Sequence, residues 1–452
     1  MNWLIDNIKN FGQSKFLSDG SVTYSYTELL NAINLYLDLI EKNKLETGEV
    51  VVISSDYSFH SISLLMALAI NGNIIVPLVT KNSAEFEEKV RISGATKIIK
   101  LENTTVSFID TTNFDEENSI IADLKKLNDA GLVLFSSGST GEPKAMVHNF
   151  TKLVNSFQDK KKKSLNMMLF LMFDHVGGVN TLLNCLSMGA HIILPQDRNP
   201  INVAGLIEKY SVQVLPTTPT FLNMMLMSQV NKQFSLGSLR MITYGTEPMP
   251  ESLLEKLKVA FPKVRLMQTF GTSETGIANT SSRSSNSLDI RFDDPNTEVK
   301  IVEGELWLRS KTQVLGYLNS DMSSFTDDGW FKTGDLVEDL GDNYFKIVGR
   351  AKEVINVGGE KVLPAEVESV VMEIEFVEDC LAYPMKNMIT GQAVGLQVVI
   401  ANNINDSEAE LRKVIRKYCS SRMERYKTPT KIEFVTKTNF GDRFKKLRLK
   451  IQ

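Results

Sequence analysis

Hydrophobic residues near the start of the chain recur with two alternating periods. After the capping pair Ser25 and Glu28, apolar side chains fall three and four residues apart, which predicts an amphipathic helix. Residues 50–54 form a short apolar run typical of a buried strand, 57–71 predict an apolar helix and 73–78 predict the next strand. Strand, helix and strand in this order predict a parallel sheet with helices on both faces.

The alternation continues far along the chain and then changes to a β pattern. Residues 165–173, 190–195 and 212–216 predict further strands, and the Ser/Asn-rich tract 280–287 predicts a loop. From Asp289, short runs of alternating polarity between glycines predict a small barrel or distorted sheet.

A separate small module is predicted after Gly349. Strands near 353–357, 380–383 and 393–400 and a helix over 407–423 give it α+β character. The expected fold class is therefore α/β: a large N-terminal region of parallel α/β subdomains with a small β element, joined to a small α+β C-terminal domain.

Composition narrows the class of protein. The 452 residues exceed what one core supports, and a net charge of −4 leaves no basic excess for nucleic acid or a membrane surface. Cys185, Cys380 and Cys419 are widely spaced, which predicts no disulfide framework and no metal site. The N-terminus lacks the apolar segment of a signal peptide, and the longest apolar run, 167–173, is too short to span a bilayer. We expect a cytoplasmic protein.

The most informative segment follows the apolar strand 132–135. It reads Ser136, Ser137, Gly138, Ser139, Thr140, Gly141, Glu142, Pro143 and Lys144. Hydroxyls, glycine backbone and one lysine suit an oxyanion, so we expect a polyphosphate-binding loop. The glycine spacing is not that of a Walker loop. A Ser/Gly linker is the alternative, but linkers seldom end in Glu-Pro-Lys directly behind a buried strand.

Two later strings carry further chemistry. In 268–276, Phe270 can stack on a purine and Glu274 can hold a hard cation that bridges phosphate oxygens. In 329–336, the carboxylate of Asp335 can accept two hydrogen bonds from vicinal ribose hydroxyls.

In this order along the chain, the strings resemble those of the adenylate-forming (AMP-binding) superfamily, which includes acyl- and aryl-CoA synthetases, nonribosomal peptide adenylation domains and luciferases. The resemblance implies activation of a carboxylate by ATP to an acyl-adenylate, followed by transfer to a thiol. It implies catalytic roles for Lys144, His175 and Glu274, and Mg²⁺ near Thr140 and Glu274. The nucleotide-binding residues that it implies are Ser136, Ser137, Gly138, Ser139, Thr140, Gly141, Gly245, Thr246, Glu247, Phe270, Gly271, Thr272, Asp335 and Arg350.

The resemblance also implies how the chain is divided. Expected are an AMP-binding domain over 1–349 and a mobile C-terminal domain over 350–452, with the hinge near Lys352. His175 would close over the carboxylate at the mouth of the acyl pocket, although a structural histidine is the alternative.

The chain departs from the resemblance near its end. Members of the superfamily carry Gly-Lys there, and the lysine bridges the substrate carboxylate and the α-phosphate. In strict register this chain has Asp442, whereas Arg443 or Lys445 could substitute after a slip of one or three residues.

The leading hypothesis is an acid–thiol ligase that uses ATP, Mg²⁺ and either CoA or the phosphopantetheine of a carrier protein. The alternative, suggested by Asp442, is an ATP- or AMP-binding pseudoenzyme with a sensor or scaffold role. Residues 160–163, four lysines, are read as a solvated turn or as a docking patch for an acidic carrier. A modest aryl or short-to-medium acyl group is the expected substrate.

Overall fold

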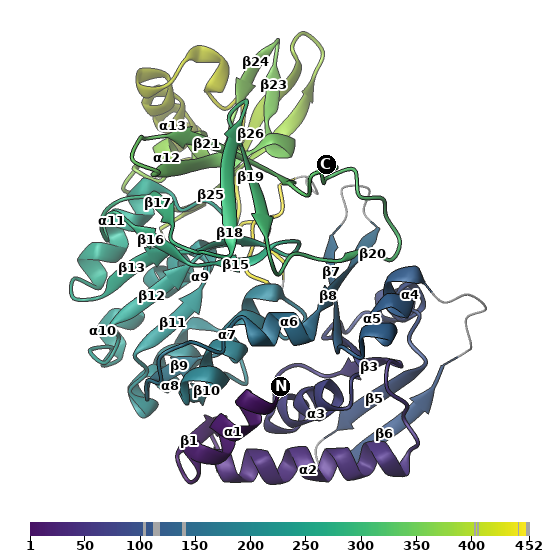
Figure 1. The fold of residues 1–452 in the computed structure, drawn as a ribbon. Helices are drawn as coiled ribbons and strands as arrows, with labels where there is room; N and C mark the ends of the chain where they lie inside the picture. Colours follow the sequence, from purple (N-terminus) through teal and green to yellow (C-terminus); the bar gives the residue numbers. More distant parts are fainter. Residues whose placement is uncertain are drawn as a thin grey trace.

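The computed structural model describes residues 1–102, 105–111, 118–137, 142–401, 404, 406–441 and 443–448, with the side chain of Ser137 left out (Figure 1). The predicted loop residues Gly138, Ser139, Thr140 and Gly141, and Asp442 in the C-terminal segment, lie outside this set.

The first sheet contains the strands predicted at the start of the chain. Its order is β20 (Gly316–Tyr317), β8 (Pro143–Asn149), β7 (Gly131–Ser137), β4 (Ile74–Leu78), β3 (Val50–Ser54), β5 (Lys97–Glu102) and β6 (Thr105–Asp110). The four inner strands β7, β4, β3 and β5 are parallel, as predicted, whereas β20, β8 and β6 pair antiparallel. The sheet is therefore mixed at both edges.

The second sheet is almost entirely parallel. Its order is β13 (Arg265–Gln268), β12 (Met241–Tyr244), β11 (Val214–Thr217), β9 (Asn166–Met168), β10 (His191–Ile193), β1 (Lys15–Ser18) and β2 (Thr23–Ser25). Only the edge strand β2 runs antiparallel to its neighbour. The apolar run 165–173 forms a shorter strand than predicted, because the chain leaves the sheet after Met168 and leads into helix α7.

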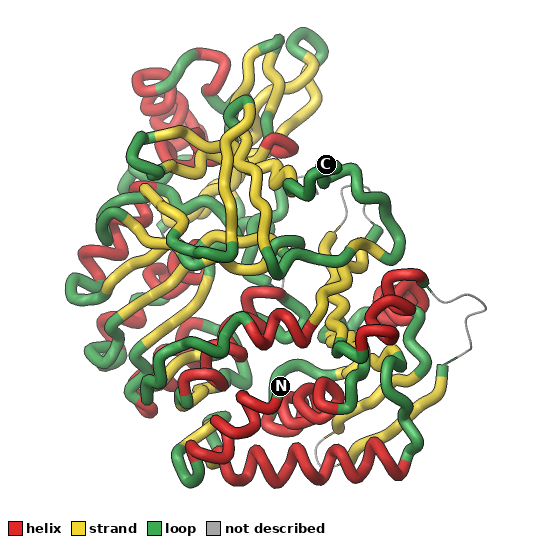
Figure 2. Tube along the Cα trace, viewed as in Figure 1, coloured by secondary structure: helices red, strands yellow, loops and turns green. Residues whose placement is uncertain are grey.

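Helices cover both sheets, as Figure 2 shows. A single apolar cluster joins the two sheets and includes residues of α1, α2, α3 and α7. The capping box of Ser25 and Glu28 starts α2, and Ser58 caps α3, which therefore begins two residues later than predicted. The helices of this region are α1 (Asn2–Phe11), α2 (Tyr26–Lys42), α3 (Phe59–Ile70), α4 (Ser83–Ser93), α5 (Ser119–Leu127), α6 (Phe150–Asn155), α7 (Val176–Met188), α8 (Pro200–Tyr210), α9 (Pro219–Met227), α10 (Val230–Gln233) and α11 (Glu251–Ala260).

A β element follows, as predicted from the short runs of alternating polarity after Asp289. The hairpin β14 (Phe270–Thr272) and β15 (Gly276–Ala278) precedes a sheet in the order β16 (Thr280–Ser282), β17 (Asp289–Phe292), β22 (Phe345–Arg350), β21 (Phe331–Asp339), β19 (Glu305–Ser310) and β18 (Thr297–Val302). The tract 280–287 is therefore only partly a loop, since its first three residues pair with β17.

The last part of the chain, at the top of Figure 1, has a sheet and a core of its own. The sheet contains β24 (Glu360–Val362), β23 (Ile355–Val357), β26 (Gly391–Ile400), β25 (Val377–Asn387) and β27 (Lys431–Phe434), with α12 (Pro364–Val371) and α13 (Glu408–Arg422). Glu353 belongs to the 3₁₀ turn Ala351–Glu353 and not to the strand predicted over 353–357. A second 3₁₀ turn spans Arg425–Lys427.

Candidate functional site

A cavity of about 2210 Å³ lies where the carboxyl ends of the parallel strands face the C-terminal segment. Side chains and backbone from both sheets, the β14–β15 hairpin and the last residues of the chain line it. The carboxyl edge of parallel strands is where open α/β sheets bind ligands. Of the predicted site residues, those that line it are Ser136, Lys144, His175, Gly245, Thr246, Gly271, Thr272, Glu274 and Arg350.

The described residues on either side of the predicted phosphate loop pair as antiparallel strands. Ser136 and Ser137 still belong to β7, and they pair with Lys144 and Pro143 of β8. The Ser136 hydroxyl and the Lys144 ammonium therefore sit at the open end of two paired strands, which holds them more firmly than a free loop would. Whether Gly138–Gly141 bind phosphate stays a prediction, because these residues are not described.

Tyr317 links the predicted lysine to the predicted carboxylate. The Lys144 ammonium lies 5.4 Å from the centroid of the Tyr317 ring, and the Tyr317 hydroxyl donates to Glu274 Oε1 at 3.2 Å. Burial raises the pKa of Glu274 above its usual range, so a cation at this carboxylate would relieve an unfavourable charge. The sequence held no signal for Tyr317, because only the pairing of β20 with β8 brings it here.

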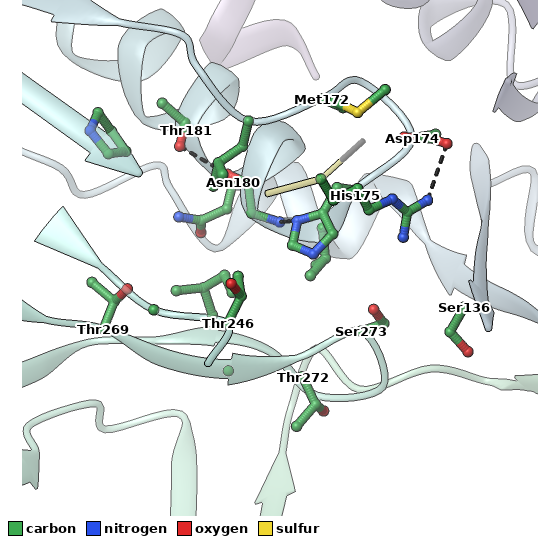
Figure 3. A pocket seen from close by; sticks show the side chains of 18 of the residues that line it. Ser136, Met172, Asp174, His175, Asn180, Thr181, Thr246, Thr269, Thr272 and Ser273 are labelled. Atoms are coloured by element: carbon green, nitrogen blue, oxygen red, sulfur yellow. Dashed lines mark hydrogen bonds and ion pairs between the residues drawn. The ribbon is translucent and has the colours of Figure 1, made fainter. Parts of the chain in front are cut away.

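His175 caps helix α7 with its own ring. Its Nδ1 accepts a hydrogen bond from the backbone N–H of Gly177 at 3.1 Å (Figure 3). Burial, with the nearby charges of Arg443 and Lys445, lowers the pKa of His175 to about 3, so the ring is neutral near pH 7. A neutral ring that accepts at Nδ1 carries its proton on Nε2. The structural and the functional interpretation of His175 are thus compatible, since capping leaves one N–H donor for a ligand.

The loop after β12 approaches the β14–β15 region closely. A Cβ atom on Gly245 would lie 2.8 Å from both the carbonyl oxygen and the hydroxyl of Thr269, so the position requires glycine. Thr246 has a left-handed backbone (φ 74°), and its buried hydroxyl has no hydrogen-bond partner in the described part of the chain. Glu247 turns to the other side, where it accepts from the backbone N–H groups of Thr220 and Lys446 at 2.7 and 3.2 Å.

Phe270 packs into the apolar core of the β element. Its side chain is 6% exposed, packs edge-on against Phe292 with ring centroids 5.7 Å apart, and belongs to the apolar cluster of the β element. Among the described residues that line the cavity, its neighbours Gly271 and Thr272 are present and Phe270 is not. One face of the ring is thus packed within the β element, and stacking of Phe270 on a purine stays a prediction.

Asp335 and Arg350 form one unit across adjacent strands. They are direct partners in the β21–β22 pairing, and Arg350 Nε lies 2.9 Å from Asp335 Oδ1. Asp335 is 4% exposed, and its burial raises the pKa of the carboxyl although Arg350 opposes this effect. Arg350 is among the described residues that line the cavity and Asp335 is not, so the ribose contact predicted for Asp335 stays a prediction.

The C-terminal segment is anchored in the N-terminal region by two side chains. Arg443 pairs with Asp174 at 3.0 Å, directly before His175. The ring of Phe444 lies between Phe170 and Phe221, with centroids 5.4 and 5.3 Å away. These contacts carry the next residue, Lys445, into the cavity.

Two lysines of this segment, Lys437 and Lys445, line the cavity, and Lys445 follows directly after Phe444. The charged groups around its ammonium are Arg350, Glu247, Glu353 and Asp335, and burial together with Arg350 lowers its pKa to about 8. Lys446, by contrast, is held 3.3 Å from Asp379 and 3.6 Å from Glu368 inside the C-terminal module. The sequence left Arg443 and Lys445 as alternatives to the usual lysine. Arg443 is paired with Asp174, whereas Lys445 lines the cavity and can contact a ligand there.

The lysine run and the cysteines give smaller results. Lys160 and Lys163 line the outer end of the cavity, and Lys160 Nζ donates to Asn279 Oδ1 at 3.2 Å, so the run is only partly a solvated turn. The three cysteines are buried and free of disulfides in the described chain. The described residues contain neither a helix long and apolar enough to cross a membrane nor a cluster of three or more His, Cys, Asp or Glu side chains suited to a metal.

The fold and the site together define an α/β enzyme-like protein in which the β7–β8 hairpin and a C-terminal lysine line the same cavity. Comparison with protein-family models identifies the family: the AMP-binding enzyme model matches residues 5–318, and the AMP-binding enzyme C-terminal domain model matches residues 366–440. The chain belongs to the AMP-binding enzyme family.

Several curated proteins are similar to the chain. The 4-coumarate:CoA ligase 1 of Petunia hybrida is 29% identical over 345 residues, which cover 69% of this chain and 63% of that protein. The 4-coumarate-CoA ligase 1 of Narcissus pseudonarcissus is 26% identical, covering 92% and 87%. The first three relatives are matched over only 60 to 63% of their own length.

Solved structures share the fold. The anthranilate CoA ligase AuaEII in complex with anthranoyl-AMP has a TM-score of 0.82 at 20% identity, covering 97% of this chain and 94% of that one. The o-succinylbenzoate CoA synthetase of Bacillus subtilis has a TM-score of 0.79 at 21% identity, covering 99% and 97%. The predicted α/β architecture with a small C-terminal module is confirmed by this likeness.

Proposed function

We propose that the protein activates a small carboxylic acid with ATP and transfers the acyl group to CoA. The observation that carries the proposal is the arrangement of one cavity between the β7–β8 hairpin, Glu274 and Lys445. The names of the relatives, which are CoA ligases and acyl-CoA synthetases, support CoA as the thiol. A carrier-protein thiol is the alternative acceptor.

In the proposed reaction, a carboxylate oxygen attacks the α-phosphorus of ATP. The bond to the leaving pyrophosphate breaks, and an acyl-adenylate forms. The thiolate of CoA then attacks the carbonyl carbon, and AMP leaves. Neither step needs a covalent bond to the protein, so positioning and charge stabilisation supply the catalysis.

The side chains of the cavity suit these steps. Ser136 and Lys144 would bind the departing phosphates, and the backbone of Gly245 and Thr246 would line one face of the adenine. The Nε2–H of His175 would orient the carboxylate. Lys445 would stabilise the negative charge that develops as carboxylate and α-phosphate meet.

Glu274 fits the proposed magnesium site. A Mg²⁺ ion keeps most of its ligands as water and phosphate oxygens, so one or two protein carboxylates suffice, and the buried Glu274 gains by pairing with a cation. When bound, the ion supplies positive charge to the phosphate oxygens.

The proposed domains are residues 1–349 and 350–452, with a hinge near Lys352. The separate sheet and apolar cluster of the last part of the chain support this division. The pseudoenzyme alternative loses its main argument, because Lys445 lines the cavity although the strict register has Asp442. A cytoplasmic location stays a prediction.

The test is pyrophosphate release with ATP, Mg²⁺ and a panel of carboxylic acids, with and without CoA. We expect release that depends on particular acids and multiple turnovers only when CoA is present. Acid-dependent release that CoA does not accelerate would point to a carrier-protein thiol. ATP binding without release for any acid would favour the pseudoenzyme.

The adenylation step should depend on pH through Lys445. Burial and Arg350 lower the pKa of Lys445 from its usual 10.5 to about 8, so the side chain is positively charged below that pH and neutral above it. We expect kcat/KM for pyrophosphate release to fall as pH rises through about 8. In the variant Lys445→Arg the charge persists, so this alkaline fall should move to higher pH. An identical alkaline fall in both proteins would exclude Lys445 as its source.

A further inference from the structure

One wall of the cavity is the polar face of helix α7. Asn180, Thr181, Asn184 and Met188 line the cavity, and their spacing of three and four residues puts them on one side of the helix. The opposite side of α7, with Val179, Leu182 and Leu186, is buried in the main core. The helix thus presents two side-chain amides and a hydroxyl to the cavity.

Figure 3 shows which end of the cavity this wall belongs to. His175 lies between two groups of side chains: Ser136 and Ser273 on one side, and Asn180, Thr181 and Thr269 on the other. Since the first side includes the predicted phosphate hairpin, the second is the space into which the acyl group of an adenylate extends. At a helical rise of ~1.5 Å per residue, Asn180 lies ~7.5 Å along the axis from His175, only a few bonds beyond the carboxylate.

The polar groups on the α7 wall differ in whether they are already satisfied. The Thr181 hydroxyl donates to the carbonyl of Gly177 at 2.8 Å, and the Asn184 amide donates to the carbonyl of Asn180 at 3.2 Å. The side-chain amide of Asn180 makes no hydrogen bond with any residue that the structure describes. Of these side chains, Asn180 is the one ready to bind a ligand.

Two hydroxyl groups on the opposite side of the cavity also lack a hydrogen-bond partner among the described residues. Thr217 is the last residue of β11, Thr246 follows the neighbouring parallel strand β12, and both line the cavity. Both hydroxyls are buried without a partner among the described residues. Figure 3 shows Thr246 on the wall opposite Asn180. A buried polar group without a partner is unfavourable, so a ligand that pairs with it removes this cost.

Gly245 and Thr269 lie in close contact, since a Cβ atom on Gly245 would come within 2.8 Å of the carbonyl oxygen and the hydroxyl of Thr269. Both residues line the cavity, to which Asn180 adds a donor and an acceptor.

We propose that the acyl site selects a short carboxylic acid that carries a hydroxyl or carbonyl oxygen, which Asn180 binds, over the unsubstituted alkyl acid of the same length. The inference rests on the proposed function and names the substrate class of that site. A site built to hydrogen-bond a substituent discriminates strongly against the analogue that lacks it, because its own polar groups are then left unpaired.

The experiment compares matched pairs of acids with equal carbon number, such as 3-hydroxybutyrate with butyrate and 4-hydroxybutyrate with butyrate, by kcat/KM for pyrophosphate release. We expect the wild-type protein to prefer a hydroxy acid. In the variant Asn180→Leu, this preference should fall by about 10- to 100-fold, because the hydroxy acid loses its partner and the alkyl acid does not.

The control variant is Asn34→Leu, the same substitution on an exposed position of helix α2, which should keep the wild-type preference. If the wild-type protein has equal kcat/KM for an alkyl acid and for its hydroxy or keto analogue, the inference is overturned and the proposed function stays intact. An unchanged preference in Asn180→Leu, with ATP binding retained, would also overturn it. No acid-dependent release with any acid would instead reject the proposed function.

Discussion

Replacing Lys445 with alanine is expected to reduce acid-dependent pyrophosphate release by about 10²- to 10³-fold, the usual loss when one preorganised charge-stabilising donor is removed. Lys445 lines the cavity, and its ammonium lies near the charges of Arg350, Glu247 and Asp335. Lys445 is proposed to stabilise the negative charge that develops as the carboxylate attacks the α-phosphate. Because this charge is absent from bound ATP, the variant should lose more in kcat than in affinity for ATP.

Thioester formation, the second half-reaction, distinguishes this role of Lys445 from a general loss of activity. Thioester formation from a synthetic acyl-adenylate does not pass through attack on phosphorus, so Lys445→Ala should retain most of it. Lys431→Ala is the matched control, since Lys431 lies in the same module but pairs with Glu433 on the surface. Equal losses in both half-reactions would argue against the proposed role, and unchanged pyrophosphate release would rule it out.

Replacing Arg448 with methionine is expected to lower the free energy of unfolding by about 3 kcal/mol, a typical result of leaving a buried charge without its main partner. Arg448 and Glu368 have side chains 5% and 3% exposed and are joined by hydrogen bonds of 2.8 and 3.2 Å. Burial of Glu368 raises its pKa, but Arg448 and Lys446 outweigh burial and hold the pKa below the usual range. Lys446 at 3.6 Å compensates only in part.

Urea denaturation, followed by tryptophan fluorescence and circular dichroism, measures this loss. Arg309→Met is the control, because Arg309 pairs with Glu298 on the surface and its loss should change the midpoint little. The double variant Glu368→Gln, Arg448→Met should recover part of the stability, since it removes the unpaired charge as well. A single variant as stable as the wild type would mean that the cluster contributes nothing to folding.

The Arg448 cluster also bears on the site. Arg448 contacts Glu353 at 3.2 Å in the turn that contains the proposed hinge residue Lys352. Lys446, two residues earlier, is tied to the same Glu368. The C-terminal segment is thus anchored at one end in its own module and at the other by Phe444 between Phe170 and Phe221. Lys445 lies between these two attachments, which explains how a chain without Gly-Lys can still present a lysine.

Much of the fold could be predicted because it depends on local patterns. Hydrophobic periodicity and the capping residues Ser25 and Glu28 indicated the α2 helix and the first parallel strands, since caps and amphipathic spacing act within a few residues. The predictions that needed correction lie at edges. The run 165–173 leaves its sheet after Met168, and the first residues of 280–287 pair with β17, because neighbouring strands decide where pairing ends.

The features of the site likewise fall into those set by local sequence and those set by tertiary packing. By itself, the sequence determined the order of elements and the string of hydroxyls, glycines and lysine from Ser136 to Lys144, because these depend on residue type and spacing alone. Only the tertiary structure decided that Phe270 turns into the β element, that Tyr317 reaches Glu274, and that Lys445 faces the cavity while Lys446 does not. The physical reason is that side-chain direction is set by packing between segments far apart in the chain, which no local pattern records.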